Sequence, residues 1–314
     1  MGELFSALPL QPWLSPWMLA LLGLMIGSFL NVVVHRLPLV LERQWWSDAA
    51  AQIDDADSYR RVFGAATPPA LARAGNDLEQ TLGALAPLSI ARPASRCPAC
   101  ATRIRWYQNI PVVSWLALRG RCSACGTRIS LRYPLVELSC AVLFGVLGAH
   151  FGAQPVVLLW CAFAAVLLAL ALIDWDTTVL PDVLTLPLLW AGVAAAALGW
   201  LPGLSLAQSI AGVVVGYLSL WAVFWLFKLA TGKEGMGYGD FKLLAALGAW
   251  LGWQAILPVV LFASVLGAVI GLAMKASGSL REGRFVPFGP FLAGGGMAVL
   301  LVGLPTVLEW LGWA

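Results

Sequence analysis

Two Cys-x-x-Cys pairs are the most specific chemical pattern in this sequence. Cys97 and Cys100 form the first pair, Cys122 and Cys125 form the second, and 21 residues lie between the pairs. Two such loops can hold one zinc ion with four thiolates in a tetrahedron, at Zn–S distances of about 2.3 Å. Because all four ligands are cysteines, no position is left for water, and the pattern predicts a structural zinc site. A redox pair or a chance arrangement is the alternative interpretation.

Carboxylates at the ends of apolar segments form a second chemical pattern. Asp174 and Asp176 end one apolar segment, Asp182 begins the next, and Asp240 lies 66 positions after Asp174. An acid at the centre of a membrane helix costs on the order of 2.5–3.5 kcal/mol, so acids in such segments are candidates for function. Two carboxyl groups that share one proton can activate water and polarise a carbonyl group, as peptide hydrolysis requires. We therefore expect Asp174 and Asp240 to form a catalytic pair.

The residues just before Asp240 support its assignment. Gly237 and Gly239 precede it, and glycines allow a substrate backbone to approach closely. Asp176 and Asp182 are interpreted as supporting or interfacial residues, because acids also cap helices and stabilise helix N-termini. Capping and interfacial solvation remain the alternative explanation for Asp174 as well.

The composition indicates what kind of protein positions these groups. Of the 314 residues, 60% are hydrophobic and 11% are charged, and the mean hydropathy is +0.84. A soluble domain is nearer half apolar and a quarter charged, so an ordinary soluble enzyme, a disordered chain and a coiled coil are excluded. The formal net charge of +3 says little about partners. The composition favours an all-α polytopic membrane protein.

A series of apolar segments is long enough to cross a bilayer, which takes roughly 17 to 25 residues per helix. The segments cover about 16–34, 135–151, 155–173, 183–200, 206–227, 241–274 and 288–310. Because 241–274 is too long for one helix and contains Gly252 and Pro258, it is expected to hold a short helix and a full one. The sequence therefore predicts about eight transmembrane helices.

The positions of the basic residues predict the orientation of these helices. Thirteen of the 19 lysines and arginines lie between Arg36 and Arg132, in the long polar stretch after the first segment. With eight spans, three further charged loops lie on that same side: 174–182, 228–242 and 275–284. The opposite loops carry no lysine or arginine: 148–154, 200–206 and the turn around Gly252. By the positive-inside rule the basic side is cytoplasmic and both termini face outward.

The predicted organisation has three parts. Residues 1–35 form the first transmembrane helix, which is expected to be retained and not cleaved as a signal peptide, because Glu3 replaces the usual basic start. Residues 36–133 form a small cytoplasmic insertion with the four-cysteine zinc knuckle, and residues 134–314 form a seven-helix membrane core. Within the insertion, 44–88 is interpreted as a solvated loop or helix, with an amphipathic helix on the membrane surface as the alternative. No internal repeat is evident.

A set of motifs, in order along the chain, resembles the bacterial type IV prepilin peptidases (leader peptidase/N-methyltransferase), a branch of the GxGD aspartyl intramembrane proteases. The motifs are Gly-Ser-Phe-Leu-Asn-Val at 27–32, His-Arg-Leu-Pro at 35–38, the four cysteines, Arg-Tyr-Pro-Leu-Val-Glu at 132–137, the acidic stretch 174–182, the glycine-rich stretch 232–242, and Pro-Phe-Gly-Pro at 287–290. The resemblance runs from the first apolar segment to the last.

The resemblance implies two activities in the bacterial inner membrane. One cleaves the basic leader from type IV prepilins and type II secretion pseudopilins on the cytoplasmic side, and the other methylates the new N-terminal amine with S-adenosylmethionine. It matches Asp174 and Asp240 to the catalytic aspartates and the four cysteines to a zinc-binding subdomain. Gly237, Gly239, Asp182 and Lys242 lie in the matched motifs as supporting residues. The implied partners are these substrates and membrane lipid, without nucleic acid, and both termini are periplasmic.

Other interpretations remain open. The methyl donor site cannot be placed, because the sequence contains no glycine-rich strand-turn-helix motif for a nucleotide. Glu137 either steers the amine of the substrate or, as we favour, binds Arg132; Asn31, His35 and Arg36 either shape the cytoplasmic opening or act as caps and anchors. Alternative functions are a peptidase without methyltransferase activity, or a zinc-stapled membrane scaffold or transporter.

Overall fold

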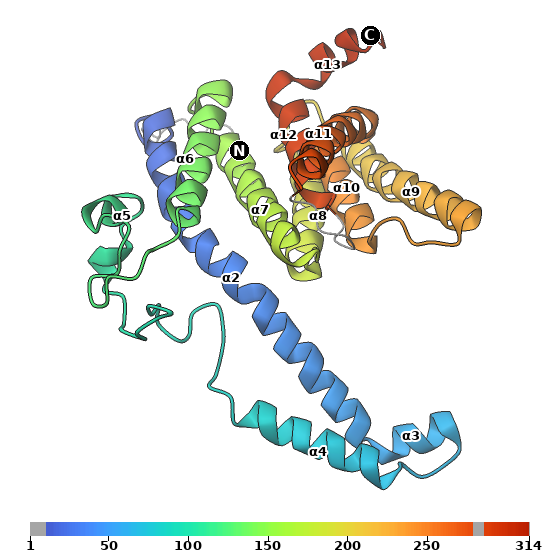
Figure 1. Cartoon of the computed structure of the whole chain (residues 1–314). Coiled ribbons are helices and arrows are strands. Elements are labelled where there is room, and N and C mark those ends of the chain that lie inside the picture. The colour runs from blue at the N-terminus through green and yellow to red at the C-terminus, as the bar shows by residue number, and fades with distance from the viewer. Residues whose placement is uncertain (1–10, 279–285, 314) are drawn as a thin grey trace. The chain divides into compact units, whose positions relative to one another are not determined.

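The computed structural model describes residues 11–278 and 286–313. Helices form almost all of the regular structure in these residues, together with two isolated bridges between arginines (Figure 1). The helices are α2 (Pro16–Asp54), α3 (Ala56–Phe63), α4 (Pro69–Gly83), η1 (Trp106–Asn109), α5 (Val113–Ala117), α6 (Arg132–Phe151), α7 (Val156–Thr177), α8 (Asp182–Ala197), α9 (Leu206–Thr231), α10 (Tyr238–Leu251), η2 (Trp253–Ala255), α11 (Ile256–Ala276), α12 (Gly289–Val302) and α13 (Leu304–Trp310).

The all-helical class is confirmed, whereas the number of eight full spans is not. Five helices in the described residues are long and apolar enough to cross a membrane: α2, α6, α7, α9 and the η2–α11 segment. The pair α12 and α13 gives a sixth if it is one span, although it bends by 100°. Each segment that was predicted as a span is helical, but α8 has 16 residues and α10 has 14. At about 1.5 Å per residue these two helices are only about 21–24 Å long, less than the hydrocarbon thickness of about 30 Å.

The first helix is much longer than the predicted segment 16–34. Helix α2 continues to Asp54 and contains Pro38 in its interior, where proline usually ends a helix. Helices α3 and α4 follow in the stretch 44–88, so most of this stretch is helical. The Asp55 side chain caps α3 by accepting a hydrogen bond of 2.8 Å from the Ser58 amide. Parts of the predicted basic loop 275–284 and both chain ends lie outside the described residues.

The chain divides into two compact units. One contains the described parts of 1–30, 111–113 and 130–314, and the other contains 31–110 and 114–129. In the first unit, α10 is the central helix and packs against α8, α9 and α12. Its residues from Asp240 to Trp250 are buried, apart from the partly exposed Lys242. Helix α10 therefore carries Asp240 at one end of a buried helix.

Glycines bring helices of the first unit into close contact. Gly212 on α9 faces Gly248 on α10 so closely that a Cβ atom on Gly212 would lie only 2.1 Å from the Gly248 carbonyl oxygen. On α2, Gly27 packs against Glu137 of α6, and a Cβ atom there would lie 2.7 Å from the Glu137 Cα. Only glycine allows the helix backbones to approach this closely at these two crossings.

The second unit is held together by packing and by arginine contacts to the backbone. Gly75 of α4 packs against Ile53 near the end of α2. The Arg36 guanidinium donates to the Ile90 carbonyl at 3.1 Å, and that of Arg43 donates to the Ala86 carbonyl at 2.8 Å. Arg36 therefore joins α2 to the segment that leads into the first cysteine pair.

Candidate active site and metal centre

Asp174 lies in the last turn of α7, a helix whose other buried residues are apolar. The helix ends at Thr178, which has a left-handed φ of 55° and donates its amide to the Asp174 carbonyl. The Asp174 side chain is buried, and its Oδ2 accepts a hydrogen bond of 3.0 Å from the amide of Gly289. Gly289 is the first residue of α12, so a helix N-terminus points at this carboxylate.

Asp240 lies in the first turn of α10, where a negative charge is favourable because the amides there have no partners within the helix. It is 7% exposed, and its own amide donates to the Gly237 carbonyl at 3.3 Å. The glycine-rich segment before α10 therefore leads the chain directly to this acid.

The structure brings Asp174 and Asp240 together from distant parts of the sequence. Their carboxyl groups are close enough to interact electrostatically. Leu180 lies beside a glycine next to each acid: a Cβ atom on Gly239, which precedes Asp240, would lie 2.9 Å from the Leu180 Cβ, and one on Gly289, which binds Asp174, would lie 3.2 Å from its Cδ2. The approach of the two acids that the sequence suggested is therefore present, whereas their catalytic role stays a prediction.

The two glycines before Asp240 have different surroundings. Gly239 is needed for packing, because its missing side chain leaves room for Leu180. A Cβ atom on Gly237 would come no closer than 4.0 Å to any described residue beyond its chain neighbours, and the residue has an ordinary φ of −83°. Gly237 is therefore not needed for packing, and it leaves the exposed backbone before α10 accessible, as close approach of a substrate backbone would need.

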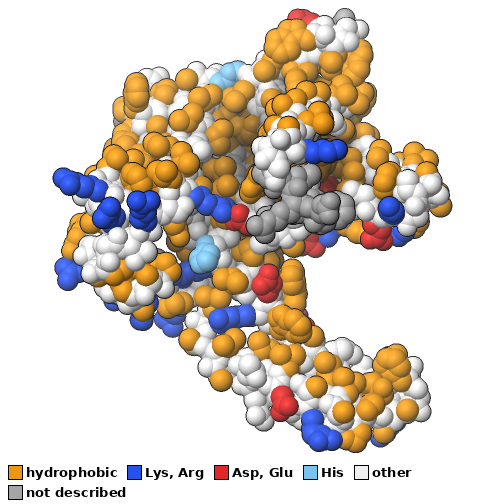
Figure 2. All heavy atoms as spheres, in the orientation of Figure 1, with side chains coloured by type: hydrophobic (Ala, Val, Ile, Leu, Met, Phe, Trp, Pro, Cys, Tyr) orange, Lys and Arg blue, Asp and Glu red, His pale blue; other side chains and the backbone are white. Residues whose placement is uncertain are grey.

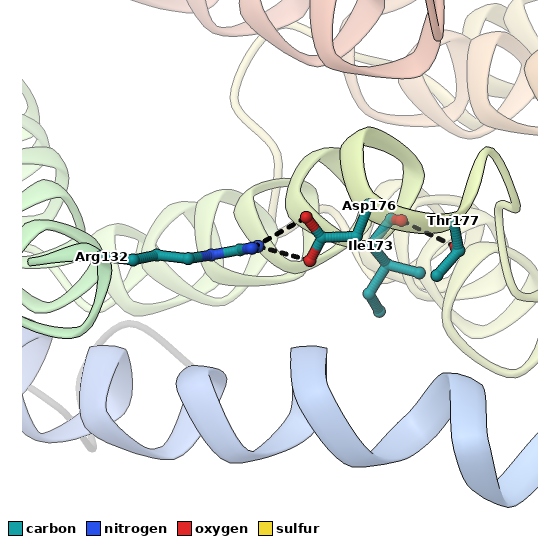
Figure 3. A network of polar contacts seen from close by, with 4 residues as sticks. All are labelled: Arg132, Ile173, Asp176 and Thr177. Atoms are coloured by element: carbon teal, nitrogen blue, oxygen red, sulfur yellow. Dashed lines mark hydrogen bonds and ion pairs between the residues drawn. The ribbon is translucent and has the colours of Figure 1, made fainter. Parts of the chain in front are cut away.

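Two ion pairs flank the acids. The Lys242 ammonium contacts both carboxylate oxygens of Asp182, at 2.7 and 2.8 Å, and so joins α10 to the first residue of α8. The Arg132 guanidinium binds both oxygens of Asp176 and joins the start of α6 to the end of α7 (Figure 3). Asp176 and Asp182 therefore have structural partners, and the supporting role expected for them stays a prediction.

The favoured interpretation of Glu137 is wrong. Arg132 is bound to Asp176, and Glu137 instead accepts a hydrogen bond of 2.7 Å from the backbone amide of Val112. The Ser28 side chain also bonds to Glu137. Val112 has a φ of 57°, which is unusual for a β-branched residue, and Glu137 holds it in this conformation. No sequence signal marks a contact made through a backbone amide 25 positions away.

The four cysteines converge on one point in the second unit. Their Sγ atoms all lie within 4.8 Å of one another, and those of Cys97 and Cys125 are 3.8 Å apart. A tetrahedron of sulfur atoms about 2.3 Å from zinc has edges of about 3.8 Å. Four thiolates at this spacing fit a zinc ion and leave no open coordination position.

The threonines beside the cysteines favour the thiolate form. The Thr127 hydroxyl and amide lower the pKa of Cys125 to about 6, and Thr102 lowers the pKa of Cys100 in the same way. A metal binds the thiolate and not the thiol, so these contacts favour the metal-binding form of both sulfur atoms.

The two cysteine loops are copies of one motif, which corrects the expectation that the chain has no internal repeat. Residues 96–104 read Arg-Cys-Pro-Ala-Cys-Ala-Thr-Arg-Ile, and 121–129 read Arg-Cys-Ser-Ala-Cys-Gly-Thr-Arg-Ile. Their hydrogen bonds correspond: Cys97 and Cys122 each donate an amide to the threonine carbonyl five positions later. A bridge closes each loop between its two arginines. The signal was present in the sequence, but it is only nine residues long.

Comparison with known proteins places these features in a family. The family model described as Bacterial Peptidase A24 N-terminal domain matches residues 21–151, and the model described as Type IV leader peptidase family matches 161–272. The chain is 47% identical over 298 residues to the prepilin leader peptidase/N-methyltransferase of Stutzerimonas stutzeri, with 93% of this chain and 92% of that protein covered. It is 46% identical to the protein of that name from Pseudomonas putida, with 96% and 95% covered. No solved structure matches the chain.

Proposed function

This chain belongs to the type IV leader peptidase family, and we propose that it is a prepilin leader peptidase/N-methyltransferase that works with Asp174 and Asp240. As an enzyme it cleaves the leader from type IV prepilins and pseudopilins and methylates the amine that cleavage exposes. The observation that best supports the peptidase site is the pairing of two buried acids from α7 and α10.

The chemistry of the pair follows from its burial. Two buried carboxyl groups that interact electrostatically do not both ionise cheaply, and we propose that they share a proton. The ionised group can take a proton from water while the protonated group donates to the carbonyl oxygen of the scissile bond. The Gly289 amide fixes the orientation of the Asp174 carboxylate during these transfers. The ion pair of Lys242 and Asp182 supports the two acids by joining α10, which carries Asp240, to the start of α8.

The methyltransferase reaction uses S-adenosylmethionine, which supplies the methyl group that the new N-terminal amine accepts. The relatives carry this activity in their name. We assign no residue of this chain to the methyl donor.

The protein is a multi-pass protein of the inner membrane. We propose that the acids and the cysteine loops face the cytoplasm and that both termini face the periplasm, because the basic residues gather in the loops on that side. Membrane lipid and the pilin substrates are its partners, and nucleic acid is not one.

Zinc is proposed as a structural ion held by Cys97, Cys100, Cys122 and Cys125. Such an ion would hold the two cysteine loops together. Because four thiolates fill its coordination sphere, it would have no position for water or substrate. Metal analysis of the purified protein should give about one zinc per chain. Four freely reactive thiols and no metal would contradict this assignment.

The test of the peptidase site is an assay of purified protein with a synthetic prepilin, with and without S-adenosylmethionine. Mass spectrometry of the product reads both reactions, because leader removal and methylation change the mass independently. We expect Asp174→Asn and Asp240→Asn to abolish cleavage while the protein still inserts in the membrane.

The matched control is Asp176→Asn, two positions from Asp174 on the same helix. It removes only an exposed ion pair, worth about 0–1 kcal/mol, so cleavage should continue at a nearly normal rate. Normal processing by either variant of the buried acids would refute the pair. Methylation of pre-cleaved pilin by these variants would show that the two activities use separate sites.

A further inference from the structure

The cysteine loops lie in a part of the chain that has basic residues and no acids. Residues 80–136 contain eight arginines and not one aspartate or glutamate. The arginines are Arg92, Arg96, Arg103, Arg105, Arg119, Arg121, Arg128 and Arg132. All eight are exposed, and within the described residues Arg132 is the only one that forms an ion pair. Figure 2 shows the blue side chains that gather over the part of the molecule labelled α5 in Figure 1. The four thiolates of the proposed zinc site offset only part of this charge, and the remaining positive charge indicates an anionic partner.

The segment that joins the two cysteine loops also exposes large apolar side chains. Trp106 of η1 is 82% exposed and Leu116 of α5 is 61% exposed. The neighbouring Trp115 behaves differently: its Nε1 donates to the Ile129 carbonyl at 3.3 Å, and its ring lies against Gly120. Trp115 therefore holds the unit together, whereas the Trp106 ring meets the neighbouring Tyr107 edge-on and leaves most of its surface in solvent.

The covalent connection to a membrane helix identifies the partner. The second unit ends at Ile129, and α6, which is long and apolar enough to span a membrane, begins at Arg132. The basic segment is therefore tethered within a few residues of a bilayer surface. Arginine binds phosphate groups through two parallel hydrogen bonds, and tryptophan is enriched at the level of the lipid headgroups.

We propose that Arg103, Arg105, Trp106, Leu116 and Arg119 form a lipid-binding surface that contacts the anionic phospholipid headgroups of the membrane that α6 enters. The arginines bind the phosphate groups, and Trp106 and Leu116 enter the boundary between headgroups and acyl chains. The surface thereby holds the cysteine unit on the membrane next to the point where the chain becomes transmembrane.

The test is hydrogen–deuterium exchange of the full-length protein in nanodiscs. One set of discs contains phosphatidylcholine alone, and the other contains phosphatidylcholine with phosphatidylglycerol. We expect the amides of 105–119 to exchange more slowly in the anionic discs, and we expect this difference to vanish near 1 M salt, where the screening length falls to about 3 Å. Each arginine near an anionic surface favours binding about fivefold. The triple variant R103Q/R105Q/R119Q should therefore lower the ratio of membrane-bound to unbound cysteine units by on the order of a hundredfold.

The matched control is R60Q/R61Q/R73Q, which removes the same charge from exposed positions on α3 and α4. It should keep the full effect of phosphatidylglycerol, and Trp106→Ala should weaken that effect.

Amides within the cysteine loops, such as those of Cys122 and Ile129, report whether each variant is folded. Equal exchange in both kinds of disc would overturn the proposal, as would protection that appears only when nucleic acid or pilin is added. Leader cleavage in detergent is measured separately, so a failed dyad assignment and a failed lipid surface give different results.

Discussion

Gly289 is the residue through which α12 touches the candidate active site. A Cβ atom at this position would lie 2.6 Å from Oδ2 of Asp174, closer than a carbon and an oxygen atom approach without a bond between them. The missing side chain is therefore what permits the amide of Gly289 to bond to the carboxylate. The requirement is steric, because the backbone of Gly289 is helical.

We predict that Gly289→Ala lowers the rate of leader cleavage about a hundredfold, since a displacement of about 1 Å in a catalytic group has an effect of this size. Single-turnover cleavage of a synthetic prepilin measures the change. Gly294→Ala on the same helix is the control, because its nearest neighbour would be a Leu266 methyl group at 3.8 Å. Equal activity of both variants would show that the Gly289 contact does not position Asp174.

The two cysteine loops differ at the residue that follows the second cysteine. Ala101 has a φ of 55° in the first loop, and Gly126 has a φ of 72° in the second. A left-handed conformation costs a residue with a Cβ atom roughly 1–2 kcal/mol, whereas glycine adopts it freely.

Ala101→Gly should therefore stabilise the first loop by about 1 kcal/mol, and Gly126→Ala should destabilise the second by a similar amount. No atom lies within 4 Å of a Cβ on Gly126, so backbone strain is the sole cause. The rate at which the cysteines react with a thiol reagent measures both changes. Shifts in the same direction for the two variants would refute the explanation from strain.

Candidate site residues could be predicted where the local sequence pattern around them is unusual. Asp174 and Asp240 were identified because acids are rare in apolar segments, and the cysteines because of their spacing. The partner of Glu137 could not be predicted, because it is a backbone amide held at a positive φ. The Gly289 contact joins positions 115 residues apart and depends on how the helices pack.

At the scale of elements, the crossing of α9 and α10 determines where the central helix lies. Gly212 and Gly248 contact each other through their backbones, so a side chain on either could not be accommodated by rotamer changes. Helix α10 carries Asp240, and the crossing therefore also fixes the distance between that acid and its neighbours.

Gly212→Ala should destabilise the protein by about 1–3 kcal/mol or more, because the added methyl group meets the backbone of α10. The melting temperature in detergent should fall. Gly271→Ala on α11 provides the opposite case: nothing lies within 4 Å of its Cβ, and replacing a helical glycine should stabilise by roughly 0.5–1 kcal/mol. An unchanged melting temperature for Gly212→Ala would contradict the close crossing.

The positions of the helices followed from apolar segments, but their lengths did not. Hydropathy placed α8 and α10 correctly, yet these helices are too short to be counted as full spans. Conversely, α2 was expected to end near Pro38, because proline usually ends a helix. It continues for sixteen residues beyond Pro38, to Asp54. The continuation is stabilised by contacts such as that of Ile53 with Gly75, which no local pattern records.

At the scale of the whole molecule, the division into two compact units predicts two separate unfolding events. Cys97→Ser should separate the two cysteine loops and accelerate tryptic cleavage at Arg105 and Arg119 in the segment between them, while α9 and α10 keep their protection. Hydrogen exchange followed by mass spectrometry reads both units in one experiment.

Cys161→Ser is the reciprocal control, because Cys161 is 2% exposed within α7 and lies in the other unit. It should weaken the helical unit and leave the cysteine loops unchanged. If Cys97→Ser opened α9 and α10 as readily as the loops, the two units would not be independent. The composition predicted the membrane class, and the run of polar residues predicted a separate insertion at 36–133. That 111–113 belong to the helical unit could not be predicted, because it depends on contacts between distant segments such as Val112 with Glu137.

The duplicated hydrogen bonding of the cysteine loops has a consequence for how the ion is gained and lost. Each loop is already closed by its own amide-to-carbonyl contacts, none of which involves sulfur. The metal therefore brings together two loops that are already folded and does not have to fold either one. This reduces the conformational entropy that is lost when zinc binds. Removal of zinc by a chelator should accordingly separate the two loops while each keeps its conformation. Rebinding of zinc should then be rapid and reversible.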